Sequence, residues 1–96
     1  MACVMRSERP GARVYAAEPE TAAPLAASFA AGRASTFDAW RASFVDGAGG
    51  RSVLASMWPL LEDWVSESLV VSLDDAAQAM RLVADRLHVI AEGAAA

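Results

Sequence analysis

Three side chains that can exchange a proton or bind a metal ion share one face of the most regular helical segment in the sequence. Asp85, His88 and Glu92 lie at positions i, i+3 and i+7, so a helix over residues 72–93 brings them to one side. A carboxylate and a histidine at this spacing bind metal ions in helical bundles. Such di-metal sites need a second motif, and His88 is the only histidine. A solvated polar face is the favoured interpretation, and a small metal- or ligand-binding protein using His88 is an alternative.

The remaining polar motifs do not form a recognisable catalytic pattern. The loop at residues 46–51, DGAGGR, lacks the spacing and the lysine of a phosphate-binding loop. The carboxylates of Glu62, Asp63 and Glu67 lie on the polar side of a predicted helix, where they are typical of solubilising charge. Cys3 stands near the N-terminus without a basic cluster. We therefore expect that the protein is not an enzyme and that it has no catalytic residue, no cofactor and no metal ion.

The composition favours one small acidic domain in the cytoplasm. The chain has 96 residues, a formal net charge of −4 and 55% hydrophobic residues, many of them alanine. The negative charge disfavours nucleic acid as a partner. No apolar run is long enough for a membrane span, and the start lacks the apolar stretch of a signal peptide. The absence of lysine and asparagine suggests a GC-rich coding sequence, which is typical of some bacteria.

The elements that carry these side chains read as helices. Ser72 is a good N-cap, and the apolar positions that follow it, from Leu73 to Ile90, repeat at spacings of three and four. Pro59 is best placed in the first turn of a helix that starts at Ser56. The segment SESLVVSL, residues 66–73, has strand character, but an isolated strand lacks a partner, so we favour helix there. The predicted helices cover residues 21–31, 35–46, 56–70 and 72–93.

These helices predict an all-α fold, a small helical bundle of three to four helices with an irregular N-terminal segment. Pro10, Gly11 and Pro19 interrupt residues 1–20, which we expect to be irregular or flexible. The helical domain then covers residues 21–93. The large apolar residues between Phe37 and Ile90 are expected to form its core.

The surplus of apolar side chains predicts an interaction surface. Aromatic residues are numerous for so small a core, and tryptophan is favoured at interfaces. Leu82 and Val89 lie beside the main apolar stripe of the helix over residues 72–93 and widen it beyond what one neighbouring helix covers. We therefore expect a non-enzymatic helical interaction protein that forms homo- or hetero-oligomers with itself or another small helical protein. The candidate interface residues are Trp40, Phe44, Trp58, Trp64, Leu82 and Val89.

The alanine-rich helical hairpin over residues 56–93, with its tryptophans, resembles the WXG100-like proteins of a secretion system in composition. The Trp-x-Gly signature of that family is absent, since Trp40, Trp58 and Trp64 are followed by other residues at the second position. The resemblance implies a partner-bound helical hairpin, and it carries no site residue over to this chain.

Overall fold

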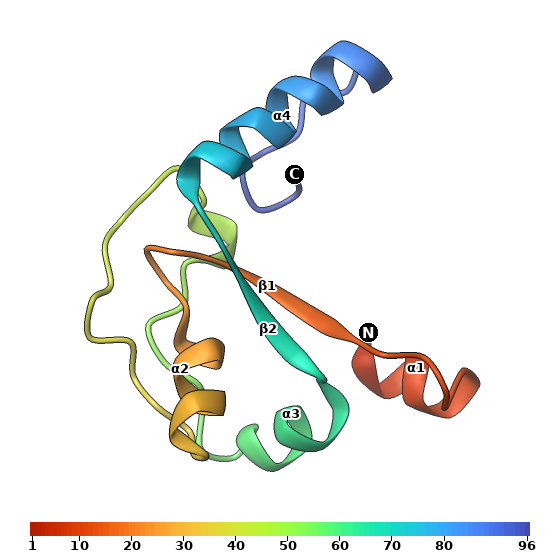
Figure 1. Cartoon of the computed structure of the whole chain (residues 1–96), viewed down its shortest axis with the longest axis vertical. Helices are drawn as coiled ribbons and strands as arrows, with labels where there is room; N and C mark the ends of the chain where they lie inside the picture. The colour runs from red at the N-terminus through yellow and green to blue at the C-terminus, as the bar shows by residue number, and fades with distance from the viewer.

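The computed structural model describes all 96 residues and contains a small parallel sheet with helices around it (Figure 1). Strands β1 and β2 pair in parallel, with Tyr15 opposite Glu67 and Pro19 opposite Val71. Parallel neighbours require a crossover connection, which residues 20–66 provide. The elements in chain order are α1 (Ala2–Glu8), β1 (Tyr15–Pro19), α2 (Pro24–Ala31), the 3-10 helix η1 (Asp46–Ala48), α3 (Trp58–Trp64), β2 (Glu67–Val71) and α4 (Leu73–Leu87).

The expected all-α bundle is wrong, because the chain has an α/β fold. The segment SESLVVSL contains strand β2, and its partner is β1, which lies in the N-terminal segment that we expected to be irregular. The physical reason is the pairing of the two strands. Neither five-residue strand is stable alone, but their backbone N–H and C=O groups bond to one another although the strands lie half the chain apart in sequence.

The predicted helix over residues 35–46 does not form. Its first residues instead pair with a later segment, through an isolated antiparallel bridge between Thr36 and Ser52. The backbone N–H of Phe37 donates to the Arg51 carbonyl at 2.8 Å. These long-range bonds leave the 35–46 backbone irregular except for the single turn of η1.

Helix α4 begins after Ser72 as predicted, α3 begins at Trp58 rather than Ser56, and both helices end earlier than predicted. Pro59 lies in the first turn of α3, and the helix stops at Trp64 because β2 follows. Ser72 caps α4, accepting a hydrogen bond of 3.1 Å from the Asp75 N–H. The helix ends at Leu87, where His88 adopts a left-handed conformation with φ of 55°. No helix of the structure combines the length and the apolar character needed to cross a membrane.

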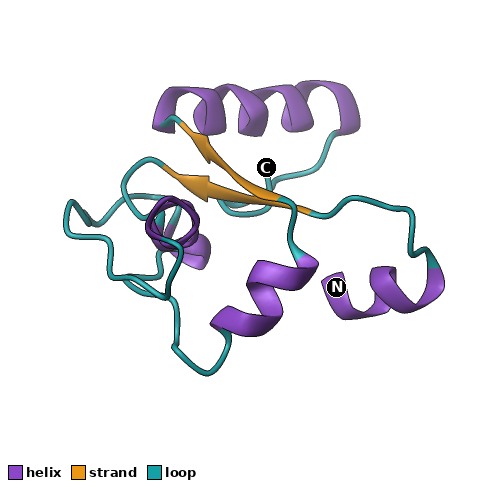
Figure 2. Cartoon of the chain, turned by 60° about the horizontal axis from the view of Figure 1, so that its bottom comes forward, coloured by secondary structure: helices purple, strands orange, loops and turns teal.

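A compact apolar core lies between the sheet and helices α2 and α3 (Figure 2). Its buried centre consists of Leu25, Trp58 and Val65, and the Phe29 ring meets Trp58 edge to face at 5.4 Å. Ser28 is fully buried beside them, where its hydroxyl donates to the Pro24 carbonyl at 2.7 Å. Helix α4 lies on the other side of the sheet (Figure 2). Only 12 of the 96 residues are buried, so this core is small for the chain length.

Candidate functional site

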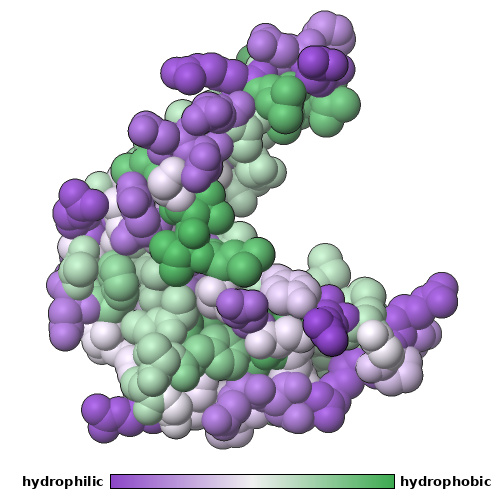
Figure 3. All heavy atoms as spheres, in the orientation of Figure 1, coloured by the Kyte–Doolittle hydropathy of each residue, from purple (hydrophilic) through white to green (hydrophobic).

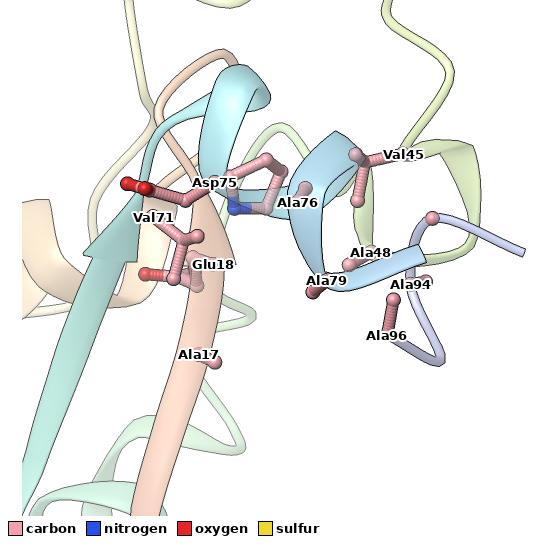
Figure 4. Close-up of a pocket in the computed structure, with 12 residues that line it drawn as sticks. Ala17, Glu18, Val45, Ala48, Val71, Asp75, Ala76, Ala79, Ala94 and Ala96 are labelled. Carbon is pink, nitrogen blue, oxygen red and sulfur yellow. The ribbon is translucent and has the colours of Figure 1, made fainter. Parts of the chain in front are cut away.

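A cavity of about 170 Å³ lies at the carboxyl ends of the two parallel strands (Figure 4). Pro19 ends β1 there and Val71 ends β2. In open α/β sheets, ligands bind beyond the carboxyl ends of the strands, so this is the natural place for a site. The strand ends, η1, α4 and the C-terminal segment all contribute to its lining: Ala17, Glu18, Pro19, Val45, Ala48, Val71, Asp75, Ala76, Ala79, Gly93, Ala94 and Ala96.

The lining is mostly small and apolar, and its only charged side chains are two carboxylates. Glu18 accepts hydrogen bonds from the backbone N–H groups of Leu25 at 2.9 Å and Ala26 at 2.8 Å. Asp75 accepts a bond of 2.7 Å from the hydroxyl of Ser72. Both carboxylates therefore bond to residues at the start of a helix, Glu18 to backbone N–H groups of α2 and Asp75 to the N-cap hydroxyl of α4. The cavity can hold a small apolar group, but it offers no cation for a phosphate and no nucleophile.

Acidic side chains at the end of β1 bind the first turns of α2 and α4, and α4 borders this cavity. Glu18 binds the first turn of α2, which has no capping side chain of its own. Glu20 follows two positions later, and its Oε1 accepts a bond of 3.2 Å from the Leu73 N–H, at the first residue of α4. Negative charge at a helix N-terminus is favourable because free N–H groups and the helix dipole meet there. Glu18 and Glu20 were not predicted from the sequence, where their only signal is an acidic pair that flanks a proline after the short apolar run YAA.

The far wall of the cavity depends on two close approaches between backbone segments. A Cβ atom at Gly93 would lie 3.0 Å from the Phe44 carbonyl oxygen. A Cβ atom at Gly47 would lie 2.9 Å from the Ala94 Cβ. Glycine therefore permits the C-terminal segment to lie against the turn around η1.

The polar motifs singled out in the sequence do not assemble into a site. Asp85 and His88 lie at the end of α4, and Glu92 lies beyond it in the C-terminal segment. The structure contains no group of three or more His, Cys, Asp or Glu side chains that could hold a metal ion. In the 46–51 loop, the Gly49 N–H donates back to the Asp46 carbonyl at 3.1 Å, so the loop closes on itself in a turn.

The candidate interface residues are dispersed over several elements. Trp58 is buried in the core, whereas Phe44, Leu82 and Val89 are about half exposed. Trp40 is half-buried, and its Nε1–H donates to the Gly49 carbonyl at 3.0 Å while the Arg51 guanidinium lies 3.8 Å from its ring centre. Trp64, at the end of α3, is also half-buried. An interface that uses the exposed members stays a prediction.

Comparison with known proteins identifies the protein family that this chain matches. The family described as pyridoxal-phosphate dependent enzyme matches residues 1–96. No curated protein sequence is significantly similar to the chain. Our expectation of a non-enzymatic interaction protein is therefore wrong, as are the alternatives of a WXG100-like protein and a ligand-binding protein using His88. No pattern in the sequence indicated an enzyme, because the chain contains no recognised catalytic motif.

Solved structures show the same relationship in three dimensions. Threonine deaminase of T.th. is 28% identical with a TM-score of 0.88, over 97% of this chain and 31% of that one. Maize serine racemase is 29% identical with a TM-score of 0.87, over 97% and 29%. Serine racemase from Dictyostelium discoideum is 25% identical with a TM-score of 0.82, over 97% and 29%. The chain thus spans less than a third of the length of these structures.

Proposed function

Because the chain belongs to the family of pyridoxal-phosphate dependent enzymes, we propose that its residues form part of the scaffold of such an enzyme. We further propose that the substrate is a small α-amino acid with a hydroxyl side chain, such as threonine or serine. This substrate class rests on the similarity to threonine deaminase and serine racemase, which extends over 97% of the chain in each case.

The residues present do not fit the cofactor by themselves. Enzymes of this type hold pyridoxal phosphate as a Schiff base on a lysine, and this chain contains no lysine. The phosphate group needs cations or free N–H donors, whereas the charged groups lining the cavity at the strand ends are carboxylates. A cofactor-bound enzyme that includes these residues must therefore obtain its lysine from polypeptide outside them. We assign these 96 residues a scaffold role and no catalytic step.

A chimera tests this proposal. The matched segment of the T.th. threonine deaminase is replaced by these 96 residues, and the purified chimera is supplied with pyridoxal phosphate. Borohydride reduction followed by mass spectrometry detects the cofactor fixed on lysine, and oxo-acid formation from threonine and serine reports activity. We expect a cofactor adduct on the chimera, measurable turnover, and no lysine adduct on the 96-residue chain alone.

Two controls make the outcome specific. The intact threonine deaminase sets the activity of the parent, and the chimera with its cofactor-binding lysine changed to alanine sets the background. A chimera that folds and binds the cofactor but acts on neither threonine nor serine contradicts the proposed substrate class. A folded chimera that binds no cofactor contradicts the scaffold role.

A further inference from the structure

The loop at residues 46–51 contains a peptide bond at which an aspartate side chain can react with the backbone. Asp46 is followed by Gly47, and the missing Cβ of glycine leaves its nitrogen free to approach the side chain of the preceding residue. Both residues are exposed. The chain has no asparagine, and every other aspartate precedes a residue with a side chain: Asp38, Asp63, Asp74, Asp75 and Asp85. This reaction is therefore favoured at Asp46 above all other positions.

The reaction needs only water as a co-reactant. The Gly47 nitrogen attacks Cγ of the protonated Asp46 carboxyl group, so that an N–Cγ bond forms and a Cγ–O bond breaks with loss of one water. Water then opens the five-membered imide. Attack at Cγ restores aspartate, whereas attack at the other carbonyl breaks the original backbone C–N bond and leaves isoaspartate. The product has the mass of the starting chain and one additional atom in its main chain.

Packing requires the glycine that makes this pair reactive. A Cβ atom at position 47 would lie 2.9 Å from the Ala94 Cβ and 3.0 Å from Oε1 of Glu92. The first distance is well below the ~3.5–4.0 Å at which two carbon atoms make a favourable contact. A residue with a side chain at this position would therefore push the C-terminal segment away from η1. Glycine follows Asp46 for a packing reason, and the reactive pair is the consequence.

The 3-10 helix η1 holds this pair in an unreactive geometry. The five-membered ring forms only when the Gly47 nitrogen lies near the plane of Cα, Cβ and Cγ of Asp46. A 3-10 helix has ψ of about −20 to −30°, which rotates that nitrogen well out of this plane. The Gly49 N–H closes the turn by donating to the Asp46 carbonyl at 3.1 Å. The reaction must therefore wait until this turn opens.

Side chains outside η1 hold the turn closed at both of its ends. After the turn, the Trp40 Nε1–H donates to the Gly49 carbonyl at 3.0 Å, and the Arg51 guanidinium covers the Trp40 ring. Before the turn, the Ser43 hydroxyl accepts the Val45 N–H at 3.2 Å. Opening of an exposed turn costs less free energy than unfolding of the whole chain. These contacts therefore set the fraction of time that the reactive pair spends in an open conformation.

We propose that Asp46 is a site of spontaneous isoaspartate formation, that the opening of η1 sets the rate, and that conversion releases one wall of the cavity at the strand ends. Val45 and Ala48 flank the reactive pair and line that cavity, where Figure 4 shows them with Ala94. An additional main-chain atom before Gly47 lengthens the turn and shifts this glycine relative to Ala94, which it closely approaches. The modification does not depend on which reaction the enzyme catalyses.

Conversion is expected to loosen the C-terminal segment. This segment runs back beside α4 (Figure 1), and hydrophobic residues line the hollow between α4 and the rest of the molecule (Figure 3). The Ala95 N–H donates to the Glu92 carbonyl at 3.0 Å, so hydrogen exchange at the Ala95 amide reports whether the segment stays in place. The consequence of the modification is therefore measurable without an activity assay.

Incubation of the purified 96-residue chain near neutral pH tests the proposal. Trypsin cleaves after Arg41 and Arg51 and releases residues 42–51 as one peptide. Chromatography separates its isoaspartate form from its aspartate form, and methylation by an isoaspartate-specific methyltransferase identifies the product. The free peptide of residues 42–51 gives the rate without η1, and urea denaturation gives the globally unfolded fraction of the chain.

Three variants separate the site from its restraint. Asp46→Glu removes the site, because its imide ring would have one more member and would close far more slowly. Trp40→Phe keeps an aromatic ring but removes the donor to the Gly49 carbonyl. Trp64→Phe is the matched control, because Trp64 is also half-buried but belongs to α3. Should Trp40→Phe be largely unfolded, Ser43→Ala decides, because it removes the acceptor on the other side of η1.

We expect isoaspartate to form in the wild-type chain at least about tenfold more slowly than in the free peptide, because only the open fraction of η1 reacts. Trp40→Phe should raise the rate about fivefold, the effect of losing one hydrogen bond. Trp64→Phe should leave the rate unchanged, and Asp46→Glu should form no isoaspartate. In the aged wild type, exchange at the Ala95 amide should quicken in the same fraction of molecules that has converted.

Several outcomes would each overturn the proposal. Absence of isoaspartate from both the wild type and Trp40→Phe would show that Asp46 is not a site. Equal rates in the wild type and the free peptide would show that η1 does not control the reaction. The same conclusion would follow if the Trp40→Phe rate did not exceed the peptide rate multiplied by the globally unfolded fraction. Unchanged exchange at Ala95 in converted molecules would show that the cavity wall stays in place.

Discussion

Ser68 on β2 donates a hydrogen bond of 2.7 Å from its hydroxyl to Oε2 of Glu18 on β1. The same carboxylate accepts the backbone N–H groups of Leu25 and Ala26 in the first turn of α2. One side chain thereby joins both strands to the helix that covers them. Since the residue at the N-cap of α2 is Ala23, which has no side-chain acceptor, Glu18 performs the capping role from a different element.

Removal of this carboxylate is expected to destabilise the fold. Glu18→Ala should lower the free energy of unfolding by about 2–3 kcal/mol, because charge-assisted bonds to two helix N–H groups and a hydroxyl are lost together. Glu18→Gln keeps one acceptor oxygen and should cost about 1 kcal/mol. Urea denaturation followed by circular dichroism measures both. Glu67→Gln is the control, since Glu67 is exposed on the neighbouring strand and should be close to neutral. Equal effects at the two glutamates would show that the cap contributes nothing.

The end of α2 is expected to be sensitive to a single methyl group. Gly32 has φ of 65°, a left-handed conformation that side chains with a Cβ rarely adopt. No atom lies within 4 Å of the position that a Cβ would occupy there, so any penalty comes from the backbone alone. Gly32→Ala should therefore lower the unfolding free energy by about 1 kcal/mol.

Gly11→Ala is the matched control for that experiment. Gly11 also has open space around a Cβ, but it lacks a positive φ. Thermal unfolding of the two variants in parallel separates backbone strain from the general cost of replacing glycine. If Gly11→Ala lowered the melting temperature as much as Gly32→Ala, the left-handed conformation would not be the cause.

The core is expected to depend on Trp58. This side chain is 8% exposed and packs against Phe29 edge to face. Trp58→Ala should cost about 3–5 kcal/mol through lost burial and the cavity that remains. A loss of that size approaches the whole stability of a small domain, so we expect the variant to be largely unfolded by circular dichroism. Trp64→Ala removes the same ring from a half-buried position and should retain the native spectrum. If both variants unfolded, the core would depend on Trp58 no more than on Trp64.

Sequence reasoning succeeded where the determining signals are local. Ser72 caps α4 as expected, and α2 ends at Ala31, the predicted end, with Gly32 as its cap, because a cap involves residues within one turn of each other. Pro59 likewise lies in the first turn of α3. These features depend on neighbours in sequence, so the rest of the fold does not alter them.

The wrong predictions concern segments whose pairing partner is distant in the sequence. Residues 67–71 were rejected as a strand for lack of a partner, because their partner at residues 15–19 lies in the segment that was expected to be irregular or flexible. Strand β1 has only five residues, and Glu18 and Pro19 within it are disfavoured in strands, so it did not stand out in the sequence. Pairing the two segments required a comparison across about 50 positions. Once β2 is a strand, the helix predicted over residues 56–70 must end early, as it does.

The functional class was not predictable from chemistry-bearing residues, because this chain carries no recognised catalytic motif. The cofactor needs a lysine, and none is present. The apolar surplus that suggested an interaction protein was a correct observation with another explanation. In the structure Leu69 is 48% exposed and Leu87 is 67% exposed, and the chain matches less than a third of the length of the solved enzyme structures. Candidate site residues such as Glu18 act through tertiary contacts that no local motif records.

The wall of the cavity at the strand ends is expected to collapse when Gly93 gains a side chain. A Cβ there would lie 3.0 Å from the Phe44 carbonyl oxygen and 3.1 Å from Val45 Cγ2, and the former is backbone that cannot rotate away. Gly93→Ala should cost about 1–3 kcal/mol and loosen the C-terminal segment from the turn around η1. Hydrogen exchange should then rise at the Ala95 amide, which donates to Glu92 at 3.0 Å. Gly50→Ala is the control, because its Cβ would meet only Pro24 Cγ at 4.0 Å, an ordinary contact. Unchanged exchange at Ala95 in the Gly93→Ala protein would show that the close approach does not hold this segment in place.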